Sequence, residues 1–394
     1  MRVGRWSIVM VWLVACGPAI PPLPSRGGPA WLEVESEHVT LWTDAGAERG
    51  RELVGEIERR RQLVMTAMNH APSKARSFVI ALRSAHEVAA YIPKQFIGVA
   101  WDDQNPTSRP GILLAANDDD REHVVNHELT HVISFAIIKN QPHWLAEGIA
   151  TYFEMADLES DKTSVQIGLP RDDRVSLFRQ QPPLSAARLF ACREARCLDD
   201  RFYATSWALF SFLLNERYDQ LARYLQRLNE LPASELPAGA HAKAWRAAFP
   251  DLTPDQLDDK LLAWLHAGKI RLPTIDVTVY DVPSRVRPLG DADALAARSL
   301  LSFQFKDEVT AMRTLSEALM IDRTNLLARL IEAAHTHSIT PDDARATAAA
   351  HPDDWRAWRL LAFALKGDPE SYRAMGRACA LAGNEAPECD RVRE

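Results

Sequence analysis

The chain has 394 residues, of which 47% are hydrophobic and 25% are charged, which is an ordinary globular composition with room for two or three domains. The net charge of −7 at pH 7 provides no basic field that would capture a phosphate backbone. We therefore expect no nucleic acid among its partners.

The first residues have the pattern of a targeting segment. Arg2 and Arg5 come before an apolar run that is shorter than the about 20 residues of a transmembrane helix. The sequence LVAC, which ends at Cys16, resembles a bacterial lipobox, in which the cysteine is acylated and becomes the mature N-terminus. We therefore expect residues 1–16 to be a lipoprotein signal peptide.

This resemblance also implies a location. The protein is expected in the bacterial cell envelope, exported and held to a membrane by its lipid anchor. Gly17 rather than Asp follows the cysteine, which by the same resemblance indicates the outer membrane. The alternative is ordinary cleavage nearby, which would leave a periplasmic or secreted protein.

After the signal peptide, residues 17–30 are rich in Pro and Gly and are expected to form a flexible linker. The hydrophobic pattern then predicts, in chain order, a strand over 31–43, a helix over 46–68, a strand over 77–83, a short helix over 84–92, a strand over 111–117, a helix ending near Lys139 and a helix beginning near Pro142. A small sheet followed by helices indicates the α+β class.

The second half of the chain is mostly helical. Residues 170–269 have helical spacing, and 273–290 are extended and punctuated by Pro, which predicts a linker. Residues 291–394 contain helices with breaks about thirty residues apart, which is similar to tetratricopeptide-like helix pairs of about 34 residues. A plain helical bundle is the alternative. Either would offer a surface to a protein partner.

Four cysteines remain after Cys16. They form two local pairs, Cys192 with Cys197 and Cys379 with Cys389. An even number of cysteines in an exported protein predicts two short-loop disulfides. Four free thiols, or a metal site at the first pair, are the alternatives.

A metal site is predicted by the sequence HELTH, which lies in a largely apolar helical stretch. His127 and His131 are four residues apart, so they project from the same face of a helix and can both bind one Zn²⁺. Glu128 lies beside the first histidine, where it can contact a metal-bound water as a base. Fifteen residues separate His131 from Glu147, which is enough for a second helix to bring this glutamate back as a third ligand.

HELTH followed by WLAEGIATYFE resembles the gluzincin metallopeptidases, in particular the peptidase MA-like domains of bacterial exported proteins. The resemblance implies a zincin-like catalytic domain over 31–272 that hydrolyses peptide bonds in a peptide or protein substrate. It implies one Zn²⁺ per chain, held by His127, His131 and Glu147, with Glu128 as the general base.

The resemblance also implies a tyrosine downstream that stabilises the oxyanion. Tyr203 lies at a comparable position, although an aromatic core role is the alternative. Aminopeptidases of this group hold the free amine with a glutamate on a strand before the zinc helix, and the strand 111–117 has no acidic residue. An endopeptidase is therefore expected, and the edge of this strand is a candidate for pairing with an extended substrate.

Three polar neighbours have less specific roles. His123 and His143 are expected at the surface or at a helix end rather than as ligands. Glu154 either orients a histidine or is solvated.

Other functions compete with the peptidase. The main alternative is a zinc-binding but catalytically idle envelope lipoprotein that binds a partner through its C-terminal helices. A structural lipoprotein with a coincidental motif and a hydrolase of non-peptide amides are the others.

Overall fold

The computed structural model describes residues 20–69, 76–92, 97–102, 107, 109–118, 121–158, 163–193, 197–232, 237–278, 280–305, 307–337, 339–383 and 389. Cys16 and the predicted signal peptide lie outside these residues. Within the described ranges, no helix is both long and apolar enough to cross a membrane.

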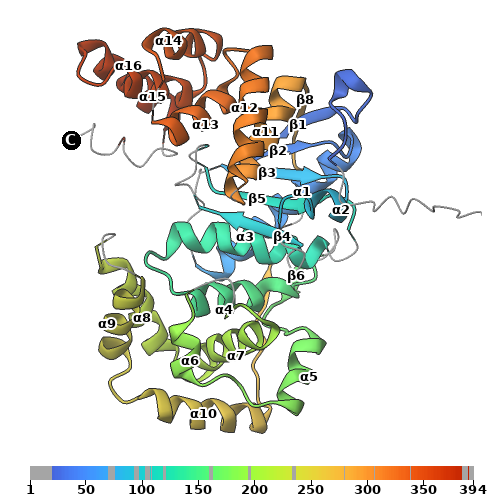
Figure 1. The fold of residues 1–394 in the computed structure, drawn as a ribbon. Helices are drawn as coiled ribbons and strands as arrows, with labels where there is room; N and C mark the ends of the chain where they lie inside the picture. Colours follow the sequence, from blue (N-terminus) through green and yellow to red (C-terminus); the bar gives the residue numbers. More distant parts are fainter. Residues whose placement is uncertain are drawn as a thin grey trace, which may run out of the picture.

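A six-stranded mixed sheet occupies the centre of the molecule, with the order β4-β5-β3-β2-β1-β8 (Figure 1). Its strands are β1 (Trp31–Glu35), β2 (Val39–Thr43), β3 (Ser77–Leu82), β4 (Gly98–Trp101), β5 (Gly111–Ala115) and β8 (Arg285–Leu289). The three inner strands β2, β3 and β5 are parallel, whereas β1, β4 and β8 each pair antiparallel with their neighbours. The single strand expected over 31–43 is thus an antiparallel pair.

Helices make up most of the remaining structure, which confirms the α+β class. In chain order they are α1 (Ala47–Ala67), α2 (Ala85–Val88), α3 (Arg121–Ile137), α4 (His143–Glu154), α5 (Asp172–Gln180), α6 (Ala186–Ala191), α7 (Asp200–Glu216), α8 (Tyr218–Glu230), α9 (Pro237–Ala248), α10 (Pro254–Ala267), α11 (Asp291–Gln304), α12 (Glu308–Ile321), α13 (Leu326–Thr336), α14 (Pro341–Ala350), α15 (Trp355–Ala364) and α16 (Pro369–Ala382). A short 3-10 helix at Pro24–Arg26 precedes them, and β6 (Ser164–Gln166) pairs with β7 (Thr274–Asp276) in a second sheet.

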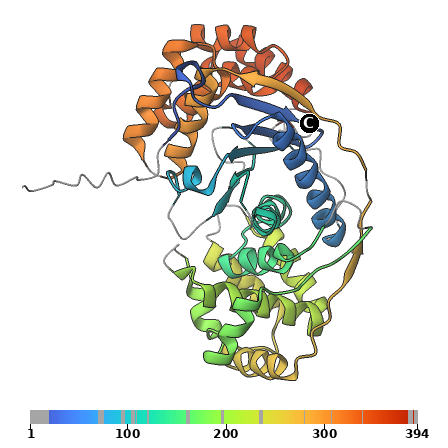
Figure 2. The same ribbon diagram turned by 90° about the vertical axis from the view of Figure 1, so that its right-hand side faces the viewer.

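Both faces of the sheet are covered by helices, which explains why its inner strands are buried throughout. On β3, Val79 and Ala81 belong to one core together with α1 and α3, whereas Phe78 and Ile80 belong to a second core with α11, α12 and α13. Figure 2 shows α1 and the C-terminal helices on opposite sides of the sheet.

The structure differs from the expected linker at 273–290. This range contains β7 and β8, and β8 forms an edge of the main sheet beside β1. Leu289 at the end of β8 enters the second core, and α11 follows directly. The chain therefore returns to the N-terminal sheet before the C-terminal helices begin.

Candidate metal centre

The two histidines of HELTH lie on α3, which is anchored beside β5. Val125 and Leu129 of this helix are fully buried in the first core. Residues of an α-helix three or four apart share a face, so this anchoring turns His127 and His131 together toward α4. The helical prediction for this stretch is confirmed.

The chain reverses between α3 and α4 by a tight connection. Asn140 has a left-handed backbone with φ of 52°, and its side-chain amide donates to the carbonyl oxygens of Leu228 and Leu231 in and after α8. Pro142 then forms the N-cap of α4. This connection brings Glu147, on the second turn of α4, back to the histidines.

Gly148 keeps α4 close to α7. A Cβ atom at this position would lie 2.7 Å from the Ser206 carbonyl oxygen and 3.1 Å from the Phe210 Cβ. Gly98 has a similar role at the other side of the site, because a Cβ there would lie 2.4 Å from Val124 Cγ1. Glycine at these two positions lets α7 and the edge strand β4 pack tightly against the helices that carry the site.

Three potential ligand atoms meet between α3 and α4. The Nε2 atoms of His127 and His131 are 3.2 Å apart, and they lie 3.2 Å and 3.3 Å from Glu147 Oε2. A tetrahedral ion with bonds of 2.0–2.1 Å requires ligand atoms about 3.3–3.4 Å apart. In the part of the chain that the structure describes, these residues form a group that could bind a metal ion. Two imidazoles and one carboxylate are a donor set that suits zinc.

The pKa values in this group are shifted because its ionisable side chains are buried close to one another. Burial alone would lower the pKa of His127, but its hydrogen bonds with Glu147 and Glu154 outweigh burial and raise the pKa to about 10. Burial alone would raise the pKa of Glu147, but His131 and His127 hold it well below its usual range. Protons and a metal ion would therefore compete for the same atoms.

Glu128 lies beside the three potential ligands and does not belong to their group. Burial raises the pKa of its carboxyl group, and His127 and His131 counter this only in part. The carboxylate also accepts a hydrogen bond from the backbone N–H of Ala100 on β4. A buried carboxylate with a raised pKa is suited to accept a proton and release it again.

Glu154 is buried behind His127, so it is not a solvated glutamate. Its Oε2 atom is 3.3 Å from His127 Nδ1, on the opposite side of the ring from Glu147. Arg174 of α5 donates to the same carboxylate, and the Arg171 guanidinium is 3.7 Å away. Burial opposes ionisation, but His127 and Arg174 lower the pKa of Glu154 to about 2. The carboxylate orients the histidine, as a second layer of partners does in metal sites.

Tyr203 of α7 also reaches the site. Its ring centroid is 6.1 Å from that of His127, and the guanidinium of Arg174 lies over the tyrosine ring at 5.1 Å. Burial, with Glu147 and Glu128 nearby, raises the pKa of its hydroxyl well above the usual range. The hydroxyl is therefore protonated near neutral pH and can act as a hydrogen-bond donor.

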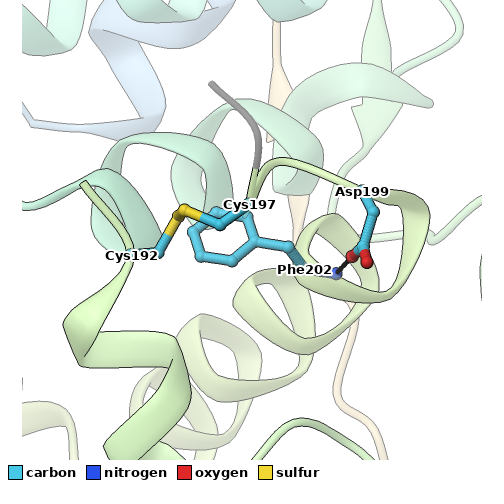
Figure 3. Close-up of a disulfide and its surroundings, with 4 residues drawn as sticks. All are labelled: Cys192, Cys197, Asp199 and Phe202. Carbon is cyan, nitrogen blue, oxygen red and sulfur yellow. Dashed lines mark hydrogen bonds between the residues drawn. A yellow bond between two sulfur atoms is a disulfide. The ribbon is translucent and has the colours of Figure 1, made fainter. Parts of the chain in front are cut away.

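A disulfide lies just before α7, and both predicted disulfides are confirmed. Cys192 and Cys197 are bonded, with their Cα atoms 5.8 Å apart, and Cys379 is bonded to Cys389. Figure 3 shows the first disulfide near the ring of Phe202. The backbone N–H of Phe202 donates to the Asp199 side chain at 2.8 Å. This N-cap defines the start of the helix that carries the next residue, Tyr203.

The site opens into a cleft of about 910 Å³. Its described lining consists of Ala90, Tyr91, Ile92, Gly98, Val99, Ala100, His127, Glu128, His131, Phe135, Gln141, His143, Ala146, Glu147, Leu198, Tyr203, Gln304 and Phe305. His143 is thus in the cleft but outside the group of three ligands, and the His123 Nδ1 is 3.3 Å from the Glu154 carbonyl oxygen.

The strand that borders the cleft is not the expected one. The strand 111–117 was the candidate for pairing with a substrate, but β5 at this position lies between β3 and β4 and has no free edge. The edge strand is β4, and its residues Gly98, Val99 and Ala100 line the cleft. The strand β4 has four residues and begins with a glycine, and the residues around it show no regular hydrophobic pattern. The sequence therefore had no periodicity from which β4 could be predicted.

Two other contributors were also missed by sequence reasoning. Arg174 and Phe305 are distant from HELTH in the chain and belong to no recognisable motif. Arg174 lies three residues after Arg171 in RDDR, and this charge pattern by itself indicates only a solvated helix start.

Comparison with known families adds one match. A family model described as "Protein of unknown function (DUF1570)" matches residues 123–233. These residues include HELTH, Glu147, the first disulfide and Tyr203, so the match covers the candidate site. No curated protein matches the chain.

Proposed function

We propose that this chain is a zinc-dependent metallopeptidase of the gluzincin type, and that it cleaves peptide bonds as an endopeptidase. The observation that carries the proposal is the meeting of His127 Nε2, His131 Nε2 and Glu147 Oε2 at 3.2–3.3 Å from one another, beside a buried glutamate and an open cleft. Two histidines and one carboxylate are a ligand set that catalytic zinc sites use when they keep a fourth position open for water or substrate.

Each remaining residue of the site has a role in this reaction. Zn²⁺, when bound, supplies a water of lowered pKa and polarises the substrate carbonyl. Glu128 accepts the proton of the attacking water and passes it to the leaving nitrogen, while the Ala100 N–H holds the carboxylate in place. Tyr203 donates a hydrogen bond to the oxygen that becomes negatively charged.

The edge of β4 supports a peptide as the substrate. An extended peptide can pair with the outer backbone groups of an antiparallel edge strand, and in β4 one of these groups, the Ala100 N–H, is already bound to Glu128. Among the described lining residues of the cleft, the acidic side chains are Glu128 and Glu147, and both already have roles. A dedicated partner for a free amine is thus missing from this lining, which favours cleavage within a chain over removal of its first residue.

The test separates chemistry from metal binding. Glu128→Gln keeps the shape of the side chain but removes the proton acceptor. Zinc should remain near one per chain, measured by elemental analysis, while turnover of a broad peptide library falls about 10²–10⁴-fold. Glu147→Ala should instead lose zinc, because one of three protein ligands is gone.

Glu122→Gln is the matched control. Glu122 is on the same helix and half-exposed, so this variant should retain both zinc and turnover. A wild-type chain that binds zinc but cleaves no peptide would contradict the proposed peptidase activity. It would favour the alternative function, a catalytically idle lipoprotein that binds a partner.

We also propose that the protein is exported and lipid-anchored at Cys16. The two disulfides support an oxidising compartment. Cys16→Ser should move the protein from the membrane fraction to the soluble fraction without changing its melting temperature. An unchanged membrane fraction would exclude the anchor.

A further inference from the structure

We propose that the end of α11 forms a wall of the cleft and that its Phe305 selects substrates with a large apolar side chain. This inference rests on the proposed peptidase and extends it to the substrate class. It also assigns substrate recognition to the C-terminal part of the chain, which sequence reasoning treated as a separate scaffold.

The first observation is the chemistry of the cleft away from the ligands. Large apolar or aromatic side chains line it, namely Tyr91, Ile92, Val99, Phe135, Leu198 and Phe305. Beyond Glu128 and Glu147, the described lining contains no Asp, Glu, Lys or Arg. A charged substrate side chain that entered would lose its hydration without gaining an ion-pair partner, whereas an apolar one would be stabilised by burial.

The second observation is that apolar surface extends directly to the metal ligands. The ring of Phe135 stacks on that of His131 with centroids 5.4 Å apart and planes at 15°. Phe135 is nevertheless 36% exposed, which leaves part of an aromatic face open beside the site. A substrate residue placed next to the metal therefore meets aromatic surface.

The third observation is that Phe305 directly follows a helix that is packed against the sheet. It follows the last residue of α11, and its N–H donates to the Leu301 carbonyl oxygen at 3.2 Å. Leu300 and Leu301 are fully buried in the core between α11 and the sheet, and Phe305 packs partly against the same core. Figure 1 shows α11 beside the sheet. A wall built on a packed helix holds its shape better than a loop would, and shape is what specificity requires.

The experiment uses the zinc-loaded full chain and a panel of amino-acid hydroxamates, which bind a zinc ion whether or not the protein turns over. Calorimetry should show that phenylalanine and leucine hydroxamates bind at least 10-fold more tightly than glutamate and lysine hydroxamates. In Phe305→Lys, the ratio of the affinity for phenylalanine hydroxamate to the affinity for glutamate hydroxamate should fall by at least 10-fold. The zinc content should stay unchanged.

Two further variants keep the result clear. Phe363→Lys makes the same change at a half-exposed phenylalanine of α15, outside the cleft, and should leave the preference as it is in the wild type. Phe305→Ala should weaken the apolar preference, and it decides the matter if the lysine variant does not fold. Equal affinity for apolar and charged hydroxamates, with zinc bound and peptides cleaved, would overturn this inference alone. A chain that binds zinc but neither hydroxamates nor peptides would overturn the proposed function with it.

Discussion

His127 has a carboxylate at each of its two ring nitrogens. Glu147 lies at Nε2, 3.2 Å away, and Glu154 lies at Nδ1, 3.3 Å away. A hydrogen bond at Nδ1 determines which tautomer the neutral ring adopts, so Glu154 leaves the Nε2 lone pair available to a metal. Buried polar groups are costly when they lack partners, and both ring nitrogens of His127 have one.

His241 of α9 is a buried histidine outside the site, and it provides a pH prediction. Its Nδ1 is 2.7 Å from the Tyr224 hydroxyl, and burial together with Arg193 lowers its pKa to about 4 from the usual 6.5. Between these values the unfolded chain binds a proton that the folded chain does not. The neutral His241 therefore contributes its full share to the free energy of unfolding above pH 6.5. As the pH falls from 6.5 toward 4, the free energy of unfolding decreases by up to about 3 kcal/mol.

Chemical denaturation between pH 4 and pH 7 measures this effect. In His241→Gln the loss of stability with falling pH should be smaller than in the wild type, even if the variant is less stable at pH 7. His266→Gln, at an exposed position on α10, should retain the wild-type slope. Parallel slopes for the wild type and His241→Gln would show that the histidine does not stay neutral in the fold.

At the scale of elements, α5 connects the two helices behind the ligands. Its Arg174 donates to Glu154 at the end of α4 and lies over the ring of Tyr203 on α7. One guanidinium thus holds both the carboxylate that orients His127 and the proposed oxyanion donor. The planar group of arginine can form an ion pair and stack on an aromatic ring at once, which a lysine ammonium does less well.

Arg174→Ala should therefore loosen the site without removing a ligand. We expect zinc affinity, measured by competition with a chelator, to fall about 10–100-fold, because the partner of an orienting carboxylate is lost. Arg174→Lys should restore part of the affinity through its charge. Arg171→Ala, at 3.7 Å from Glu154, should have a smaller effect. Unchanged zinc affinity in Arg174→Ala would show that Glu154 is held by other contacts.

At the scale of the whole molecule, the sheet has two cores, and the second depends on the C-terminal helices. Trp31, Trp42, Phe78 and Leu113 of the sheet are buried in one cluster with Leu295, Leu300 and Ile331 of α11 and α13. Helices α14, α15 and α16 form a further cluster with the other side of α13. The boundary between units that the packing indicates therefore lies near α13, rather than before α11.

Truncation tests this boundary. A chain that ends at Gly290 exposes the second face of the sheet. Each large apolar side chain there then no longer contributes the about 1.5–3 kcal/mol by which its burial stabilises the fold. We expect this fragment not to fold, as judged by near-UV circular dichroism and zinc content. A chain that ends before Pro341 keeps α11 to α13 and should fold and bind zinc. A Gly290 fragment that melts like the full chain would show that the N-terminal unit is independent.

Local spacing in the sequence was enough to predict several features of this protein. His127 and His131 share a face because the helical period is 3.6 residues, and the structure places Glu147 with them. The two disulfides join cysteines only five and ten residues apart, so their pairing needed no knowledge of the fold. The α+β class followed from the order of periodic segments.

Only the tertiary structure decided which distant segments complete the cleft and the sheet. β8 pairs with β1 across about 250 residues, and Arg285 reaches Glu35 at 3.0 Å. Arg174 reaches Glu154 from another helix, and Phe305 reaches the cleft from beyond the sheet. Such contacts leave no periodic trace in the sequence, because they depend on how whole elements pack and not on the spacing of neighbouring residues.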